Sequence, residues 1–280
     1  MQKKIAVIND IAGYGRCAMT VLLPIISYMG VQTCPLLTSV FSSNTAFPDF
    51  FKDDYTDRME PYIESWEKIG LHHKFDGIAT GYLGSARQIE IVRRFVREFS
   101  AEETLVIVDP VMGDHGRLYS AYTVELCTEL RKLVALADII TPNLTEACRL
   151  ADMSYKEKGW KRKELFAMAS RLSDMGPSHV VITGIPQGEY IANYVYVKTD
   201  SEDPAARLIR VHRAGEERCS TGDVFSAVIA ADAVNGVPFD KSVRKASRFV
   251  KQCIEKALEL GTPLAEGVPF EAVLYRLRRG

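Results

Sequence analysis

The chain has 280 residues, 47% of them hydrophobic and 25% charged, so one domain over 1–280 with a substantial core is expected. A formal net charge of −1 gives no basis for binding nucleic acid or an anionic membrane. No apolar run reaches the length of a membrane span, the apolar start is too short for a signal peptide, and the six cysteines contain no Cys-x-x-Cys pair. We therefore expect a cytoplasmic protein with reduced thiols.

Apolar strand patterns alternate with helical patterns along the whole chain. Up to the middle, the expected elements are strand 4–8, helix 17–29, apolar run 31–40, loop 41–49, helix 55–69, strand 75–80, helix 86–99 and strand 104–108. Beyond it, they are helix 121–134, strand 137–141, helices 144–151 and 161–175, strand 180–183, antiparallel strands 190–198 and 208–212, and helices 222–235, 239–260 and 269–278.

The strands are apolar on both faces and separated by helices, which predicts an α/β fold with a parallel sheet covered on both sides. The late hairpin adds antiparallel strands at one edge. Ligands of such folds bind at the carboxyl ends of the strands. The polar residues that close the expected strands are therefore the site candidates: Asp10, Ser42 to Thr45, Tyr82, Asp109, Asn143, Glu146 and Thr183.

A polar stretch, 218–223, runs through one glycine into the apolar helix expected at 222–235. Ser220 or Thr221 is suited to be the N-cap, and Asp223 lies in the first turn. The free N–H groups of a helix start can hold phosphoryl oxygens while a carboxylate there accepts a proton from an attacking hydroxyl. The simpler alternative is that Asp223 only offsets the helix dipole.

Two nucleotide-binding patterns are disfavoured. The run Gly13-Tyr14-Gly15-Arg16-Cys17-Ala18 fits G-x-G-x-x-A, but its first glycine comes too late for a tight strand-to-helix turn. The second apolar run also ends without an acid that could hold a ribose, which argues against a nicotinamide enzyme. The sequence contains no Gly-x4-Gly-Lys-Ser/Thr loop, so it is not a P-loop enzyme.

Acidic residues follow neighbouring strands. Asp109 ends one strand, Asp114 lies five residues later in a glycine-rich loop, and Glu146 follows the next strand. Neighbouring parallel strands would bring these acids to one edge, where carboxylates and a phosphate can share Mg²⁺. Taken singly, each acid is better explained as a cap or a loop acid, since Asn143 and Glu146 form an Asn-x-x-Glu capping box. Together with Asp223, they favour phosphoryl transfer.

Four motifs, in this order and at suitable separations, resemble those of the pyridoxal kinase family within the ribokinase-like superfamily of ATP-dependent kinases. They are Gly81-Tyr82-Leu83-Gly84-Ser85, Asp109-Pro110-Val111-Met112-Gly113-Asp114, Thr141-Pro142-Asn143-Leu144-Thr145-Glu146 and Ser220-Thr221-Gly222-Asp223. The early segments 13–15 and 41–45 are similar to that family's substrate side, so the resemblance covers nearly the whole chain. It implies a three-layer α/β/α sandwich.

The resemblance also implies roles for individual residues. Asp223 would be the base that deprotonates the 5′-hydroxymethyl group of a vitamin B6 vitamer. The N–H groups of Ser220, Thr221, Gly222 and Asp223 would form the anion hole, and Asp109 and Glu146 would organise Mg²⁺, partly through water.

The same resemblance implies binding residues and partners. Those along the ATP phosphates would be Asp114, Asn143, Thr183 and Thr221, and those around the pyridine ring would be Tyr82, Thr45 and Asp10. Kinases of this kind often use a monovalent cation such as K⁺, and a homodimer is usual. No nucleic acid or membrane partner is expected.

Two departures keep alternatives open. Ser220 stands where the family usually has glycine, which predicts a negative φ at this position and leaves a binding homologue without turnover as an alternative. Asp10 stands where many pyridoxal kinases have serine, and it looks more like hydroxymethylpyrimidine kinases. The preferred substrate therefore stays open between the B6 vitamers and that pyrimidine.

Overall fold

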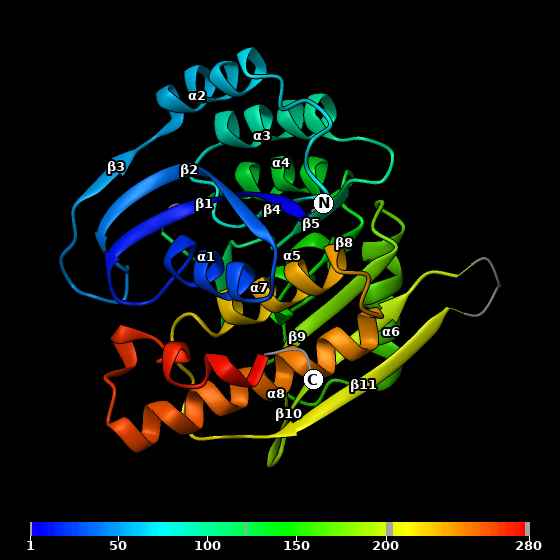
Figure 1. Ribbon diagram of the computed structural model, residues 1–280. Coiled ribbons are helices and arrows are strands. Elements are labelled where there is room, and N and C mark those ends of the chain that lie inside the picture. Colours follow the sequence, from blue (N-terminus) through cyan, green and yellow to red (C-terminus); the bar gives the residue numbers. More distant parts are fainter. Residues whose placement is uncertain (1, 121, 200–203, 278–280) are drawn as a thin grey trace.

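The structure is a computed structural model that describes residues 2–120, 122–199 and 204–277, and its strands and helices alternate along the chain (Figure 1). The strands are β1 (Lys4–Tyr14), β2 (Gln32–Ser43), β3 (Lys52–Asp54), β4 (Gly77–Thr80), β5 (Leu105–Val108), β6 (Gly113–Asp114), β7 (Arg117–Leu118), β8 (Ile139–Ile140), β9 (His179–Gln187), β10 (Tyr190–Val197) and β11 (Ala205–His212). The helices are α1 (Met19–Tyr28), α2 (Thr56–Lys68), α3 (Ala86–Phe99), α4 (Val124–Val134), α5 (Leu144–Leu150), α6 (Arg162–Ser173), α7 (Thr221–Val234) and α8 (Phe239–Leu260), followed by the 3-10 turns η1 (Leu264–Glu266), η2 (Phe270–Ala272) and η3 (Leu274–Leu277).

Among the described residues, nine strands form one sheet in the order β11-β10-β9-β8-β5-β4-β1-β2-β3. The strands from β9 through β2 run parallel, whereas β10, β11 and β3 pair antiparallel at the two edges. The predicted α/β fold, with a mostly parallel sheet and antiparallel edge strands, is confirmed.

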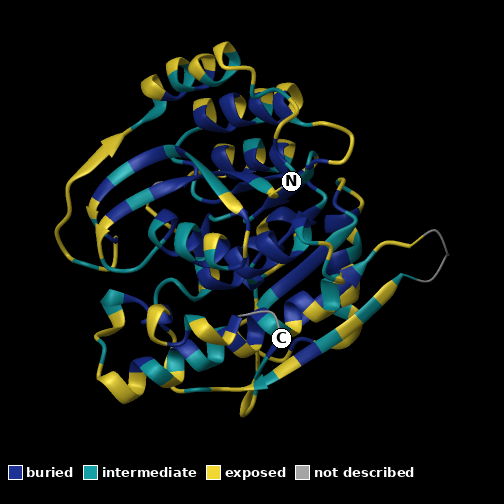
Figure 2. Cartoon of the chain, viewed as in Figure 1, coloured by how far each residue is buried: buried dark blue, intermediate teal, exposed yellow. Residues whose placement is uncertain are grey.

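Successive residues of the central strands pack into two different cores, as the two-residue period of a strand requires. In β1, Ala6 and Ile8 face the core made with α2 to α6, whereas Ile5 and Val7 face the core made with α1, α7 and α8. The helices therefore cover both faces of the sheet (Figure 1), and the central strands are dark blue, buried, in Figure 2. Over the described ranges, none of the helices combines the length and apolar character needed to cross a bilayer.

Several boundaries differ from those expected. Strand β1 continues past Asp10 to Tyr14, so Asp10 lies within the strand, beside a register shift between Asn9 and Ile11. Strand β2 passes through Pro35, which is tolerated because β3 pairs only with Ser39 to Phe41 and leaves that stretch at the sheet edge.

Helix boundaries and a short hairpin also differ. Helix α4 begins at Val124, capped by the Thr123 side chain, and residue 121 lies outside the described residues. The helix expected at 269–278 is replaced by η2 and η3, and residue 278 lies outside the described part. The hairpin β6–β7 was not predicted, because two-residue strands carry too little pattern to be recognised.

Candidate active site

Helix α7 begins at the crevice formed by the carboxyl ends of the central strands, and Asp223 is its third residue. The half-buried Asp223 carboxylate accepts a hydrogen bond from the backbone N–H of Ala18, at 2.9 Å. Ala18 holds a positive φ of 47°, which is rare for a residue with a Cβ and fixes its N–H toward the acid. Burial raises the pKa of Asp223 to about 6, against the lowering effect of this hydrogen bond.

Ser220 is the N-cap of α7, but its backbone is left-handed, with φ 67°, so the expected negative φ is wrong. Its hydroxyl makes no capping bond and instead donates to the Cys219 carbonyl, at 2.5 Å, and accepts from the Val268 N–H, at 3.3 Å. A Cβ at Gly267 would lie 2.6 Å from the Ser220 hydroxyl, so close packing requires glycine there. The segment after α8 thus supports the loop at the start of α7.

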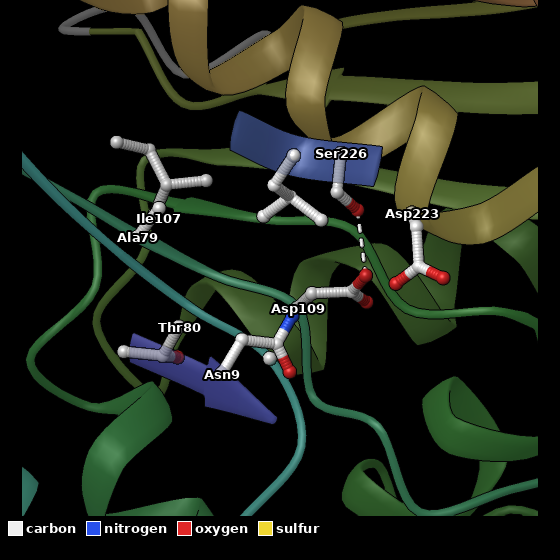
Figure 3. A pocket seen from close by; sticks show the side chains of 9 residues that line it. Asn9, Ala79, Thr80, Ile107, Asp109, Asp223 and Ser226 are labelled. Atoms are coloured by element: carbon white, nitrogen blue, oxygen red, sulfur yellow. Dashed lines mark hydrogen bonds between the residues drawn. The ribbon is translucent and has the colours of Figure 1, made fainter. Parts of the chain in front are cut away.

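Asp109, at the end of β5, faces the first two turns of α7. Its carboxylate accepts a hydrogen bond from the Ser226 hydroxyl at 2.6 Å, and Ser226 lies three residues after Asp223 on the same helix face. Burial, and then the charge of Asp223, raise the pKa of Asp109 to about 7. Both carboxylates line a cavity of about 10 Å³, a volume suited to a single water molecule (Figure 3).

Glu146 and Asn143 form the predicted capping box of α5. The buried Glu146 carboxylate accepts the N–H groups of Asn143, at 2.8 Å, and Met112, at 3.1 Å. Burial and the nearby Asp109 charge raise the pKa of Glu146 well above its ordinary value. Each carboxylate oxygen of Glu146 keeps a further lone pair, so the residue can cap its helix and still serve as a ligand.

Of the other residues predicted at the phosphate side, Asp114 and Thr183 lie beside this capping box. Asn143 donates through its side chain to the Gly113 carbonyl at 2.8 Å, which ties the loop after β5 to α5. Thr183 pairs with Asn143 across an isolated parallel bridge. Asp114 lies on β6, and Thr221 donates its hydroxyl to the Arg218 carbonyl at 3.2 Å.

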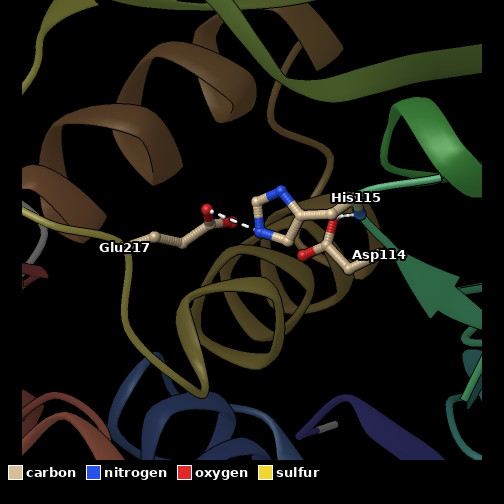
Figure 4. Close-up of side chains that lie close together, drawn as sticks. All are labelled: Asp114, His115 and Glu217. Carbon is tan, nitrogen blue, oxygen red and sulfur yellow. Dashed lines mark hydrogen bonds and ion pairs between the residues drawn. The ribbon is translucent and has the colours of Figure 1, made fainter. Parts of the chain in front are cut away.

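Asp114 also belongs to a cluster that sequence reasoning did not anticipate. Its carboxylate, the His115 ring and the Glu217 carboxylate lie within 4.8 Å of one another (Figure 4). His115 Nε2 lies 3.1 Å from a Glu217 carboxylate oxygen, and both side chains are largely exposed. This contact joins the β6–β7 turn to the loop before α7, across the mouth of the crevice.

On the other side of the crevice, Asp10 is 8% exposed, and its backbone N–H donates a hydrogen bond to the Asn9 side-chain oxygen at 3.0 Å. Burial, and then the charge of Asp223, raise the pKa of Asp10 to about 7, while the charge of Lys52 opposes this rise. Asp10 and Asp223 are therefore close enough for their charges to interact.

Tyr82 follows β4 and is partly buried between two other rings. Its ring makes edge contacts with Phe41, at 6.1 Å between centroids, and Tyr122, at 6.0 Å. Thr45, predicted beside it, is exposed, and the buried residue of that turn is Asn44, whose side chain donates to the Ala265 carbonyl at 2.5 Å. The structure thus brings together Tyr82 and Asp10 on one side of the crevice and leaves Thr45 at its rim.

Comparison with known proteins identifies the family of the chain. The family model described as phosphomethylpyrimidine kinase matches residues 23–267. The chain belongs to that family. The kinase prediction and the predicted α/β fold are thereby confirmed.

Individual relatives of this kinase carry two kinds of name. A putative phosphomethylpyrimidine kinase from Bacteroides thetaiotaomicron, crystallised with pyridoxal, is 38% identical with a TM-score of 0.93, over 99% of this chain and 96% of that one. A pyridoxine/pyridoxal/pyridoxamine kinase of Bordetella avium is 28% identical over 86% of this chain and 81% of its own length. A hydroxymethylpyrimidine/phosphomethylpyrimidine kinase of Staphylococcus aureus is 26% identical over 83% of this chain and 80% of its own length.

Sequence reasoning missed several residues of this kinase's crevice. Ser226 could have been found, because a hydroxyl three residues after a first-turn acid shares its helix face. The Ala18 N–H and Lys52 offered no local signal, since both reach the crevice through pairing between distant segments. Glu217 was not among the predicted residues, because its contact with His115 depends on the unpredicted β6–β7 turn.

Proposed function

We propose that this protein is an ATP-dependent kinase that phosphorylates the 5′-hydroxymethyl group of a vitamin B6 vitamer. The observation that carries the proposal is the Asp223 carboxylate at the start of α7, with its pKa raised to about 6, facing Asp109 and Asp10. A carboxylate that only offset a helix dipole would not need burial against two other acids. Family membership and the pyridoxal-bound relative support the same chemistry.

In the proposed reaction, Asp223 accepts the proton of the 5′-hydroxyl as its oxygen attacks the γ-phosphorus of ATP and ADP leaves. The N–H groups of residues 220–223 hold the transferring phosphoryl oxygens, with the positive end of α7 behind them. A pKa near 6 leaves Asp223 ionised at neutral pH while keeping it a stronger base than an exposed aspartate. The Ala18 N–H keeps the carboxylate oriented.

The acids at β5 and α5 fit a magnesium ion. Asp109 and Glu146 would supply the hard oxygen ligands that Mg²⁺ prefers, and because burial raises the pKa of both carboxyls, a divalent cation bound there would stabilise their ionised forms. Bound there, the ion would offset charge on the phosphates of ATP. Asp114, Asn143, Thr183 and Thr221 are proposed to lie along those phosphates.

On the acceptor side, we assign Tyr82 to the face of the ring and Asp10 to a protonated ring nitrogen or an amine. Thr45, exposed at the rim, would contact the substrate only from that side. Because Asp10 is also the residue that resembles hydroxymethylpyrimidine kinases, phosphorylation of that pyrimidine is the second candidate, and the Staphylococcus aureus relative carries that name. We also propose that the kinase is cytoplasmic and forms a homodimer.

The test is product formation from MgATP, with K⁺ present, on pyridoxal, pyridoxine, pyridoxamine and hydroxymethylpyrimidine. Asp223→Asn should lower kcat about 10³-fold. Asp240→Asn is the matched control, because Asp240 is also an acid in the first turn of a helix, α8, and should keep wild-type turnover. Turnover on hydroxymethylpyrimidine alone would make that pyrimidine, rather than a B6 vitamer, the substrate. ATP binding without turnover on any alcohol would favour a non-catalytic binding homologue.

A further inference from the structure

One cation points into the acceptor side of the crevice. Lys52, on β3, pairs in register with Phe41 on β2, so the two side chains leave the same face of the sheet. The Lys52 ammonium lies 5.6 Å from the centre of the Phe41 ring and 5.7 Å from that of Tyr82. It also donates to the Tyr82 hydroxyl at 3.4 Å. Three separate contacts therefore direct the amine of an otherwise exposed lysine toward the aromatic wall.

Lys52 and Asp10 give this side of the crevice charges of opposite sign. The Lys52 charge acts on the Asp10 carboxyl, whose pKa it lowers against the effect of burial. A 3-hydroxypyridine has a complementary pair of charges. Protonation of its ring nitrogen makes the 3-hydroxyl acidic, so the ring can carry a positive pyridinium nitrogen and a negative 3-oxygen. A hydroxymethylpyrimidine has ring nitrogens but no ring hydroxyl.

Resting on the proposed function, we infer that Lys52 is a specificity-determining residue that binds the 3-oxygen of the B6 ring while Asp10 binds its nitrogen. The kinase therefore prefers 3-hydroxypyridines to pyrimidines. Recognition of a charged group by a dedicated donor discriminates strongly against an analogue that lacks the group, because the donor then loses its partner. Asp10 alone would not distinguish the two rings.

The experiment compares Lys52→Met with wild-type enzyme on pyridoxine, 3-deoxypyridoxine and hydroxymethylpyrimidine, using kcat/KM for each. Methionine keeps the apolar stem and removes the charge. We expect a loss of about tenfold on pyridoxine, reflecting one charge-assisted hydrogen bond at a partly wet site, and less than about twofold on the other two alcohols. Lys52→Arg should restore most of the pyridoxine activity. Lys68→Met, in the last turn of α2, is the remote charge-removal control.

Each outcome bears on one proposal only. An equal loss on all three alcohols, or an unchanged ratio of pyridoxine to 3-deoxypyridoxine, would overturn the inference, since Lys52 would then only hold β3 against the aromatic wall. Wild-type enzyme that phosphorylates none of the alcohols would overturn the proposed function instead. A thermal unfolding measurement on each variant separates loss of recognition from loss of the fold.

Discussion

The two sides of the crevice are built differently. On the side of β5, α5 and α7, the acids Asp109, Glu146 and Asp223 are held by backbone N–H groups or a buried hydroxyl. On the side of the arm formed by residues 44–54, which includes β3, the side chains Phe50 and Phe51 are 38% and 67% exposed. Under the proposed function, charge handling would be fixed by the fold, whereas the exposed arm that carries Lys52 could change at little cost to stability.

After the loss expected for Asp223→Asn, the next largest effect is expected on the fixed side. Glu146→Gln should lower kcat about 100-fold on every alcohol. The proposed metal site serves the phosphates of ATP, so its loss should affect all acceptors equally. Glutamine keeps one acceptor oxygen for the Asn143 N–H of the capping box, so α5 should stay folded although the bond from the Met112 N–H is lost. Glu164→Gln is the matched control, since Glu164 occupies the same position in the capping box of α6. Steady-state kinetics at varied Mg²⁺ checks both variants, and equal loss in both would contradict a metal role.

A smaller effect is expected where the fixed side carries strain. Ser220→Ala keeps a Cβ in the left-handed region and loses the bonds to Cys219 and Val268, so kcat should fall about tenfold. Ser220→Gly loses the same two bonds but adopts this backbone without strain, so its kcat should lie between those of the alanine variant and the wild type. Similar rates for the alanine variant and the wild type would show that the hydroxyl is not needed to place the anion hole.

On the adaptable side, Tyr82→Leu should act on binding rather than on chemistry. Loss of the aromatic face should raise the KM of the alcohol about fivefold, with kcat within about twofold of wild type. Measuring KM for ATP in the same experiment is the control, since Tyr82 lies away from the phosphate side. A large fall in kcat would contradict the prediction that Tyr82 acts on acceptor binding and not on the chemical step.

The smallest effect is on stability, and it has the opposite sign to the effect on activity. The folded-state pKa of Asp223 lies above its ordinary value of 3.8, at about 6, so the ionised carboxylate destabilises the folded state above that pH. The shift corresponds to about 3 kcal/mol before solvent screening of this half-buried group, so Asp223→Asn should raise the free energy of unfolding by about 1 to 2 kcal/mol at pH 8, and the gain should fade as the pH falls from 6 toward 4. Denaturant unfolding at both pH values checks this. A constant gain would assign the effect to packing.

Sequence patterns predicted the layers and the acids but not the connections between distant segments. Asp109, Glu146 and Asp223 were identified because strand ends and helix starts are local features that the chain itself marks. A negative φ was predicted for Ser220, but the observed φ is positive. The local sequence does not indicate this, since the Val268 N–H that binds the Ser220 hydroxyl comes from 48 residues away.

Polar positions near the substrate side were also only partly predictable. Asp10 was taken as the end of a strand, but pairing with β2 extends β1 to Tyr14. Thr45 was preferred to its neighbour Asn44, although only Asn44 turns inward, toward the Ala265 carbonyl. Such outcomes depend on which segment packs on the other side, and the local sequence does not encode that.

The turn that follows α8 has a consequence for how the protein is made. Thr262 accepts from Arg218, Glu266 accepts from Tyr14, and Val268 donates to Ser220, so this late segment holds both the start of α7 and the end of β1. During synthesis, these contacts cannot form until residues 262–268, which follow every strand of the sheet in the chain, have left the ribosome. The nascent chain would therefore assemble its sheet first and acquire a working crevice only at the last stage of folding.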